Sequence, residues 1–214
     1  MNRIVTVVLG SAFLAAGAPT VARASLILDF ESVATGTATS LVFSGGGLTA
    51  TLTRGGLSFS IINLSGLAPP SFGSRTLDPF SNTNSTPFLL NFSQGITGLS
   101  IDMGDFVPSD EDILSLQLFS GLNGTGTLLG SSSIPLPGTG SGLSFFSPSV
   151  TGVAGAQSAV FIGGSTAFPN SVYYDNISVT FNETTTVPEP SAFALLVTGL
   201  VGVGFFARKR RFQI

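Results

Sequence analysis

The sequence predicts an all-β protein, an antiparallel β-sandwich, with an accessory segment at each end. Short apolar stretches alternate with breakers rich in Gly, Ser, Thr, Asn and Pro along residues 25–187. Several of these stretches alternate apolar and polar residues, which is typical of strands with one face on a core. No part of this region sustains the 3.6-residue period of a helix. About eight to ten such strands favour a jelly roll, because sandwiches join many short strands by turn-rich loops.

The expected strands follow one another between breakers. The stretch 26–32 is expected to be the first strand, and it carries Asp29 and Glu31. In the stretch 113–119, leucines at 114, 116 and 118 alternate with Ser115 and Gln117, so one face is apolar. The other strands are expected at 48–53, 57–62, 88–92, 97–102, 158–163 and 172–181, with breakers at 44–47, 68–73, 121–126 and 135–140.

The N-terminus has the pattern of a secretory signal peptide. A basic start is followed by a short apolar run at 4–18 and by the small-x-small tripeptide Ala22-Arg23-Ala24. A first transmembrane helix fits less well, because the run is short and Pro19 follows it. We therefore expect residues 1–24 to form a signal helix, which signal peptidase removes between Ala24 and Ser25.

The C-terminus combines an apolar run with a basic tail. Residues 191–207 carry no charge and are near the lower length limit for a transmembrane helix. The basic residues that follow favour the cytoplasmic side of the inner membrane. They are Arg208, Lys209, Arg210 and Arg211. A plain anchor would account for this much, but not for the preceding Val187, Pro188, Glu189 and Pro190.

This order of Pro-Glu-Pro, apolar helix and basic cluster over 188–211 resembles the PEP-CTERM sorting signal, a motif also labelled as ice-binding-protein C-terminal. The resemblance implies processing by an exosortase, a membrane-embedded cysteine transpeptidase, near Pro188–Pro190. Such substrates occur in Gram-negative bacteria with extracellular polysaccharide or biofilm systems. The implied protein passes the inner membrane, is anchored there before processing, and afterwards lies at the cell surface or is secreted.

Charge and composition exclude several classes of function. Residues 25–187 hold two basic residues, Arg54 and Arg75, and ten acidic ones, which gives 2 − 10 = −8. So acidic a domain repels phosphate backbones, so we expect no nucleic-acid partner. The chain has no Cys and no His, and its one Lys, Lys209, lies in the tail. Thiolate, Ser-His-Asp, zinc and P-loop chemistry are thereby excluded.

The acidic residues suggest two candidate sites for a structural Ca²⁺, which prefers several oxygen ligands. Asp29, Glu31 and Asp175 lie in the first and last expected strands, which are often neighbours in a sandwich. Ordinary outward-facing strand residues or turn caps would explain them equally well. The alternative is a loop joining the strands at 97–102 and 113–119, for which a solvated surface loop is the favoured interpretation. Its acids are Asp102, Asp105, Asp110, Glu111 and Asp112.

The body of the chain is also similar to known domains. The stretches "MGDF", "LSLQLFSGLNGTGTLLGS" and "YYDNISVTF" resemble β-sandwich domains of other PEP-CTERM proteins, and "YYDNISV" is similar to the last strand of galactose-binding-like carbohydrate modules. The resemblance implies a cell-surface or matrix protein that binds extracellular polysaccharide or builds a biofilm. The alternative is a secreted carbohydrate-active hydrolase that uses a pair of carboxylates.

Overall fold

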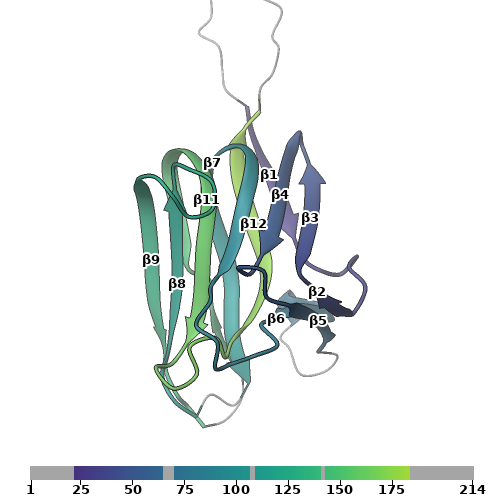
Figure 1. Ribbon diagram of the computed structural model, residues 1–214, viewed down its shortest axis with the longest axis vertical. Coiled ribbons are helices and arrows are strands. Elements are labelled where there is room, and N and C mark those ends of the chain that lie inside the picture. The colour runs from purple at the N-terminus through teal and green to yellow at the C-terminus, as the bar shows by residue number, and fades with distance from the viewer. Residues whose placement is uncertain (1–21, 65–69, 107–108, 141–142, 184–214) are drawn as a thin grey trace, which may run out of the picture. The chain divides into compact units, whose positions relative to one another are not determined.

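The computed structural model describes residues 22–64, 70–106, 109–140 and 143–183, which belong to one compact unit, Ala22–Glu183 (Figure 1). Among these residues no helix is long and apolar enough to cross a membrane. The predicted signal helix up to residue 21, the predicted transmembrane helix 191–207 and the basic tail 208–211 lie outside the described residues. So do Val187, Pro188, Glu189 and Pro190 of the sorting signal.

The described chain is built almost entirely of strands. They are β1 (Arg23–Leu28), β2 (Gly36–Ala38), β3 (Ser40–Gly45), β4 (Leu48–Thr53), β5 (Phe59–Asn63), β6 (Arg75–Asp78), β7 (Phe88–Phe106), β8 (Asp112–Phe119), β9 (Leu128–Leu136), β10 (Leu143–Phe146), β11 (Ser149–Gly164) and β12 (Tyr173–Asn182), with one 3₁₀ turn, η1 (Pro70–Phe72). The predicted all-β class is confirmed.

All strand pairs are antiparallel, and the main path runs β2-β5-β6-β12-β7-β11-β8-β9. The β3–β4 hairpin joins this path through β7, and β1 pairs with β12 in the register Leu26↔Val179. The first and last strands are therefore neighbours, as the sequence predicts. The antiparallel sandwich is confirmed, while the jelly-roll, galactose-binding-like assignment stays a prediction.

The long strands β7 and β11 each change neighbours along their length. The first part of β7, around Leu90, pairs with β4 and β11, and its later part, around Leu99, pairs with β12 and β11. At the change, a Cβ on Gly95 would lie 2.7 Å from the Cα of Gly155, so only glycine permits this close backbone approach. The prediction of separate strands at 88–92 and 97–102 is wrong, because β7 continues through Gly95 as one strand.

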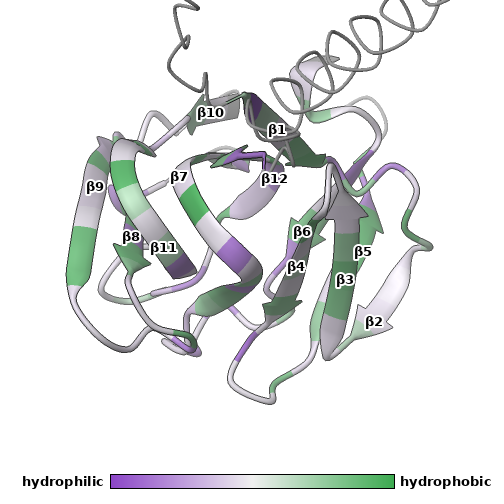
Figure 2. Cartoon of the chain, turned by 90° about the horizontal axis from the view of Figure 1, so that it is seen from above, coloured by the Kyte–Doolittle hydropathy of each residue, from purple (hydrophilic) through white to green (hydrophobic). Residues whose placement is uncertain are grey.

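The core consists of the apolar faces of the strands. Leu114, Leu116 and Leu118 are all fully buried on β8, so the predicted two-residue alternation is confirmed there. Figure 2 shows the same alternation as hydrophobic and hydrophilic bands along β7. An aromatic cluster joins β7 to its neighbours, since the ring of Phe88 lies 5.3 Å from that of Phe161 and 5.1 Å from that of Tyr174. Each such buried side chain contributes about 1.5–3 kcal/mol.

Most predicted strands differ from the observed ones in their bounds, and two of the differences concern residues of the predicted sites or breakers. The first strand ends at Leu28, so Asp29 and Glu31 lie in the following turn and not in a strand. β9 continues through Pro135, which the sequence marks as a breaker. Pro135 is tolerated because β9 is an edge strand that pairs only with β8 among the described strands, so a missing N–H breaks no ladder bond on its open side.

The expected signal-peptidase site falls at the start of the domain. Ala22 accepts a hydrogen bond from the Glu183 amide, and Ala24 pairs with Phe181 inside β1. Cleavage before Ser25 would leave four residues of β1, Ser25–Leu28, paired with β12.

Candidate functional site

The predicted set Asp29, Glu31 and Asp175 is brought to one region but is used mainly for hydrogen bonds. Glu31 accepts bonds from the amides of Ser74 and Arg75, at 2.6 and 2.9 Å, and from the Ser74 hydroxyl at 2.7 Å. The Arg75 amide, and then the Ser74 hydroxyl, lower the pKa of Glu31 by stabilising its charged form. Asp29 accepts a bond from the Glu31 amide. Glu31 therefore fastens the segment after η1.

Asp175 differs from the other two because it is fully buried. Its Oδ1 accepts a bond from the Asn176 amide at 2.7 Å, and its Oδ2 has no hydrogen-bond partner. Burial raises the pKa of Asp175 to about 8, and the nearby charges of Glu31, Asp102 and Asp29 add to the rise. Burial therefore favours the protonated form of Asp175 at neutral pH.

The alternative acidic set does not form one site. Asp102 lies directly across from Asp175 in the β7–β12 pair and accepts bonds from the Ser147 hydroxyl and the Asn176 amide group. Asp112 is fully buried at the start of β8, where its Oδ1 accepts a bond from the Ser171 hydroxyl at 3.1 Å and its Oδ2 has no partner. Burial raises the pKa of Asp112 to about 6, and the charges of Asp105 and Asp110 add to the rise.

The candidate calcium sites can be compared with this geometry. Within the described ranges, no group of three or more acidic side chains is placed to hold a metal ion. The structure divides the alternative set, because Asp102 joins the region of Asp175 while Asp112 is held by Ser171. A structural Ca²⁺ stays a prediction.

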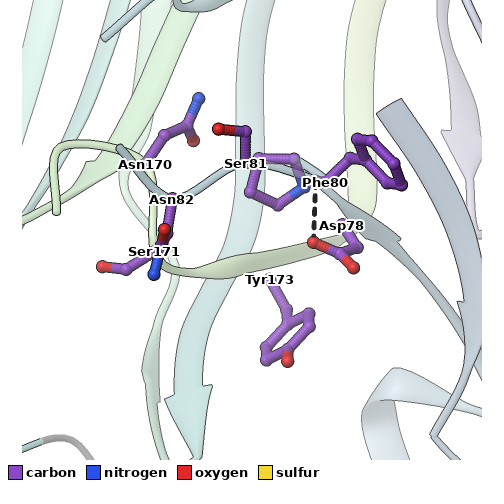
Figure 3. A pocket seen from close by; sticks show the side chains of 8 residues that line it. Asp78, Phe80, Ser81, Asn82, Asn170, Ser171 and Tyr173 are labelled. Atoms are coloured by element: carbon purple, nitrogen blue, oxygen red, sulfur yellow. Dashed lines mark hydrogen bonds between the residues drawn. The ribbon is translucent and has the colours of Figure 1, made fainter. Parts of the chain in front are cut away.

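A polar pocket of about 320 Å³ lies where β6 ends and where the loop before β12 returns (Figure 3). Figure 3 shows Asp78 and Phe80 on one side of the view and Asn82, Asn170 and Ser171 on the other. The lining presents hydroxyl, amide and carboxylate groups beside the aromatic rings of Phe80 and Tyr173. The lining residues are Asp78, Pro79, Phe80, Ser81, Asn82, Asn170, Ser171 and Tyr173.

One wall of the pocket is held from beneath by Arg54, whose side chain is only 1% exposed. Its guanidinium group donates to four main-chain carbonyls of the segment 79–86 and lies over the Phe88 ring, 5.4 Å from the ring centroid. The acceptors are Pro79, Ser81 at 3.2 Å, Asn84 at 3.0 Å and Thr86 at 3.1 Å. A planar group with five N–H donors suits this task, because one side chain fixes several carbonyls at once.

The opposite wall is fixed by Asn170. Its amide donates to the main-chain carbonyl of Asn82 at 3.2 Å, and its side chain donates to the carbonyl of Thr86 at 3.2 Å. Its Oδ1 accepts a bond from the buried hydroxyl of Tyr174 at 2.6 Å, which in turn accepts from the Gly163 amide. The two walls are therefore tied to each other and to the core, so the pocket is preformed.

Phe80 has two unusual features at once. Its side chain is 66% exposed, and its backbone φ of 65° is in the left-handed region, which costs a side chain such as Phe about 1–2 kcal/mol. The Asp78 carboxylate holds this turn by accepting a bond from the Phe80 amide at 2.9 Å. Such strain persists where the surroundings enforce it, which is typical of binding sites. The strain presents an apolar ring at the rim of a polar pocket.

The charged groups at the surface of the pocket are acidic, while the charge of the buried Arg54 acts on Asp78 from behind the wall. Asp78 belongs to the lining, and Asp105 lies close enough for both charges to act on the Tyr173 hydroxyl. Burial is the main reason that the pKa of Tyr173 is raised, and the charges of Asp78 and then Asp105 raise it further. The lining contains no basic residue.

Sequence reasoning missed this pocket, although two signals pointed to it. Between β6 and β7 the chain reads "PFSNTNSTP", a polar loop too long for a tight turn. Arg54 is one of only two basic residues between 25 and 187. A buried cation is unusual in a domain with so few basic residues, which indicates a structural task.

Comparison with known families places the C-terminal segment. The family model of the PEP-CTERM protein-sorting motif matches residues 186–211, which include the Pro-Glu-Pro triplet and the whole basic cluster. Comparison with curated proteins found no match to the chain. The predicted resemblance is thus confirmed for this segment. The chain carries the PEP-CTERM sorting motif, which implies an exported protein that an exosortase sorts in a membrane-linked step.

Proposed function

We propose that the domain formed by Ala22–Glu183 binds polysaccharide at the pocket between β6 and the loop before β12, and acts at the cell surface or in the matrix of a biofilm. The observation that carries the proposal is the combination of a preformed polar pocket with the exposed ring of Phe80. Sugars offer hydroxyl groups for directed hydrogen bonds and an apolar ring face for aromatic contact. Sites with a few fixed polar groups beside aromatic surface are suited to such ligands.

The anchoring of the pocket supports binding without a large conformational change. Arg54 and Asn170 fix the main chain of both walls, so little ordering cost remains to be met when a ligand enters. The sorting motif supports an extracellular ligand, because it implies that the domain is exported. A soluble or matrix-bound glycan fits this destination.

The test is a binding measurement on a panel of polysaccharides with the full chain in detergent micelles. Phe80→Ala should weaken binding by about tenfold, in line with an exposed aromatic anchor. Phe168→Ala is the matched control, because Phe168 is 43% exposed but does not line the pocket. The proposal fails if no polysaccharide binds, or if both alanine variants bind as the wild type does.

The hydrolase alternative has one observation in its favour. Asp78 lines the pocket, and burial raises the pKa of the neighbouring Asp105, with Asp110 adding to the rise. A carboxylate beside a carboxyl of raised pKa is the pair that acid–base hydrolysis of glycosides needs. Release of reducing ends that is lost in both Asp78→Asn and Asp105→Asn would favour catalysis over binding.

A further inference from the structure

We infer that the pocket takes a neutral sugar unit and rejects acidic polysaccharides such as those rich in uronate or sulfate. The inference rests on the proposed function and sharpens it, because it names the chemical class of the ligand. It is carried by how the domain distributes its few positive charges. The question is whether any cation can reach a ligand in the pocket.

The nearest arginine cannot serve an anionic ligand. Arg54 lies directly beneath the wall 79–86, but its side chain is 1% exposed and its donors are directed to main-chain carbonyls. Arginine binds a carboxylate or sulfate most strongly through two parallel N–H groups. Arg54 would have to release the pocket wall to provide them, and the pocket would lose its shape.

The other arginines of the described residues are also engaged or distant. Arg75 donates to the main-chain carbonyls of Glu31 and Val33, on the turn that follows β1. Arg23 lies at the start of β1, paired with Asn182, and neither arginine lines the pocket. A uronate in the pocket would therefore lose part of its hydration without gaining an ionic partner, which is costly.

An anionic ligand would lack a cationic partner in the pocket, and it would also be repelled by acidic side chains. Asp78 belongs to the lining, and its charge and that of Asp105 act on Tyr173 in the pocket. Like charges brought together in a partly desolvated site disfavour the wrong ligand, which is how specificity is often obtained. Neutral sugars avoid the repulsion and still use the carboxylate as an acceptor.

The same residues fit a neutral sugar well. The Oδ1 atom of Asp78 accepts a hydrogen bond from the Phe80 amide, and its Oδ2 atom is left to accept one from a sugar hydroxyl. The amide groups of Asn82 and the hydroxyl of Ser81 supply both donors and acceptors. Phe80 presents an exposed ring for the apolar face of a hexose. A hydroxyl-rich ring without charge is the ligand that uses all of these groups.

The test compares neutral with acidic polymers on the full chain, using dextran and galactomannan against alginate and polygalacturonate. Neutral binding should be at least about tenfold tighter and should change by less than about twofold between about 50 and 500 mM NaCl, because no ion pair is formed. Asp78→Asn should weaken neutral binding but not acidic binding, so that the preference shrinks. Glu111→Gln is the matched control, because Glu111 is an exposed acid outside the pocket.

The outcomes separate the two claims. Tighter binding of alginate or polygalacturonate, weakened by salt, would overturn the inference and leave the proposed function intact. Absence of binding to every polymer would overturn both. The charge of Asp78 is tested separately by a spectroscopic titration of the Tyr173 phenol. Asp78→Asn should lower the pKa of Tyr173, whereas Glu111→Gln should not. An unchanged titration in Asp78→Asn would also overturn the inference.

Discussion

Arg54 is the residue whose replacement tests the architecture of the pocket most directly. Arg54→Met keeps a long apolar side chain over the Phe88 ring but removes all five N–H donors. The carbonyls of Pro79, Ser81 and Asn84 then lose their partner, whereas the carbonyl of Thr86 keeps the bond from the Asn170 side chain. The carbonyls nearest the surface can turn to water, whereas Pro79 is buried and cannot do so without moving the wall.

The expected loss follows from these contacts. A hydrogen bond from a charged donor contributes about 1.5–3 kcal/mol, and a buried carbonyl left without a partner costs about 1–3 kcal/mol. Because water can replace part of the lost bonds, we take about 3–5 kcal/mol for the whole set. For a domain of this size each kcal/mol lowers the melting temperature by about 2–4 °C. We therefore expect Arg54→Met to melt about 6–20 °C below the wild type. The melting temperature of Arg54→Lys should lie between those of the wild type and Arg54→Met, since an ammonium group keeps the charge but lacks the planar set of N–H donors of a guanidinium group.

Thermal unfolding followed by circular dichroism and by tyrosine fluorescence measures this loss. The chain has no Trp, so the emission of its two tyrosines, Tyr173 in the pocket and Tyr174 in the core, is observable. Arg75→Met is the matched control, because it removes an arginine that holds a different turn. The expectation is refuted if the free energy of unfolding of Arg54→Met is within about 1 kcal/mol of the wild-type value, or if Arg75→Met lowers it by as much.

Three further predictions concern a buried acid, a strained residue and the sorting motif. Asp175→Asn should stabilise the domain at pH 7 by about 1–3 kcal/mol, because the amide needs no proton on folding, although its NH2 group replaces one unpaired buried atom by another. The folded pKa of about 8 lies above the ordinary 3.8, so the folded state keeps a proton that the unfolded state loses, and stability falls as pH rises from about 4 to 8. Denaturant titrations across this range should show a smaller fall in Asp175→Asn, and an equal fall would contradict the assignment. Added Ca²⁺ that raises the melting temperature of the wild type but not of the variant would instead support an ion at Asp175. Phe80→Gly should raise the unfolding free energy by up to about 1 kcal/mol, because glycine adopts a positive φ freely, while weakening polysaccharide binding; a loss of both would argue against stored strain. Replacing Pro188–Pro190 with alanines should leave the tail 191–214 on the protein in cells that have the exosortase. Intact mass decides this outcome, and normal removal of the tail would exclude the motif as its signal.

The strand pattern could be predicted from the sequence wherever one face of a strand is buried. β8 alternates leucine with polar residues, and its predicted bounds, 113–119, differ from Asp112–Phe119 by one residue. β4 is predicted at its observed bounds, Leu48–Thr53. The hairpin turn at Gly46 and Gly47 is found where the breaker 44–47 placed it, with both residues at positive φ. Local periodicity and turn chemistry carry this information, so no tertiary contact is needed.

The sequence could not show where strands bend, or which residues meet. Gly95 is a breaker by composition, but in the fold it lets β7 pass Gly155 and continue. The short strands β2 and β6 exist because they pair with β5, not because their own residues favour a strand. The pocket likewise depends on pairings between distant segments, such as Asn170 with Asn82. Such contacts depend on which strands pair and in which register, and a single sequence does not reveal this pairing.

The two arginines of the exported region explain why its charge stays uncompensated. Arg54 and Arg75 both direct their donors to main-chain carbonyls, so they fix loops and neutralise few of the ten acids around them. Four of the eight basic residues of the chain lie in the tail 208–211, within the sorting motif. Removal of that cluster by an exosortase, together with removal of the signal peptide and its two arginines, would leave residues 25–187 with a net charge of 2 − 10 = −8. Such a charge resists association of the protein with itself and with anionic polymers. The strong negative charge of the domain and the lack of a free cation in the pocket have the same cause. The region 25–187 has only two arginines, and both hold loops through main-chain carbonyls.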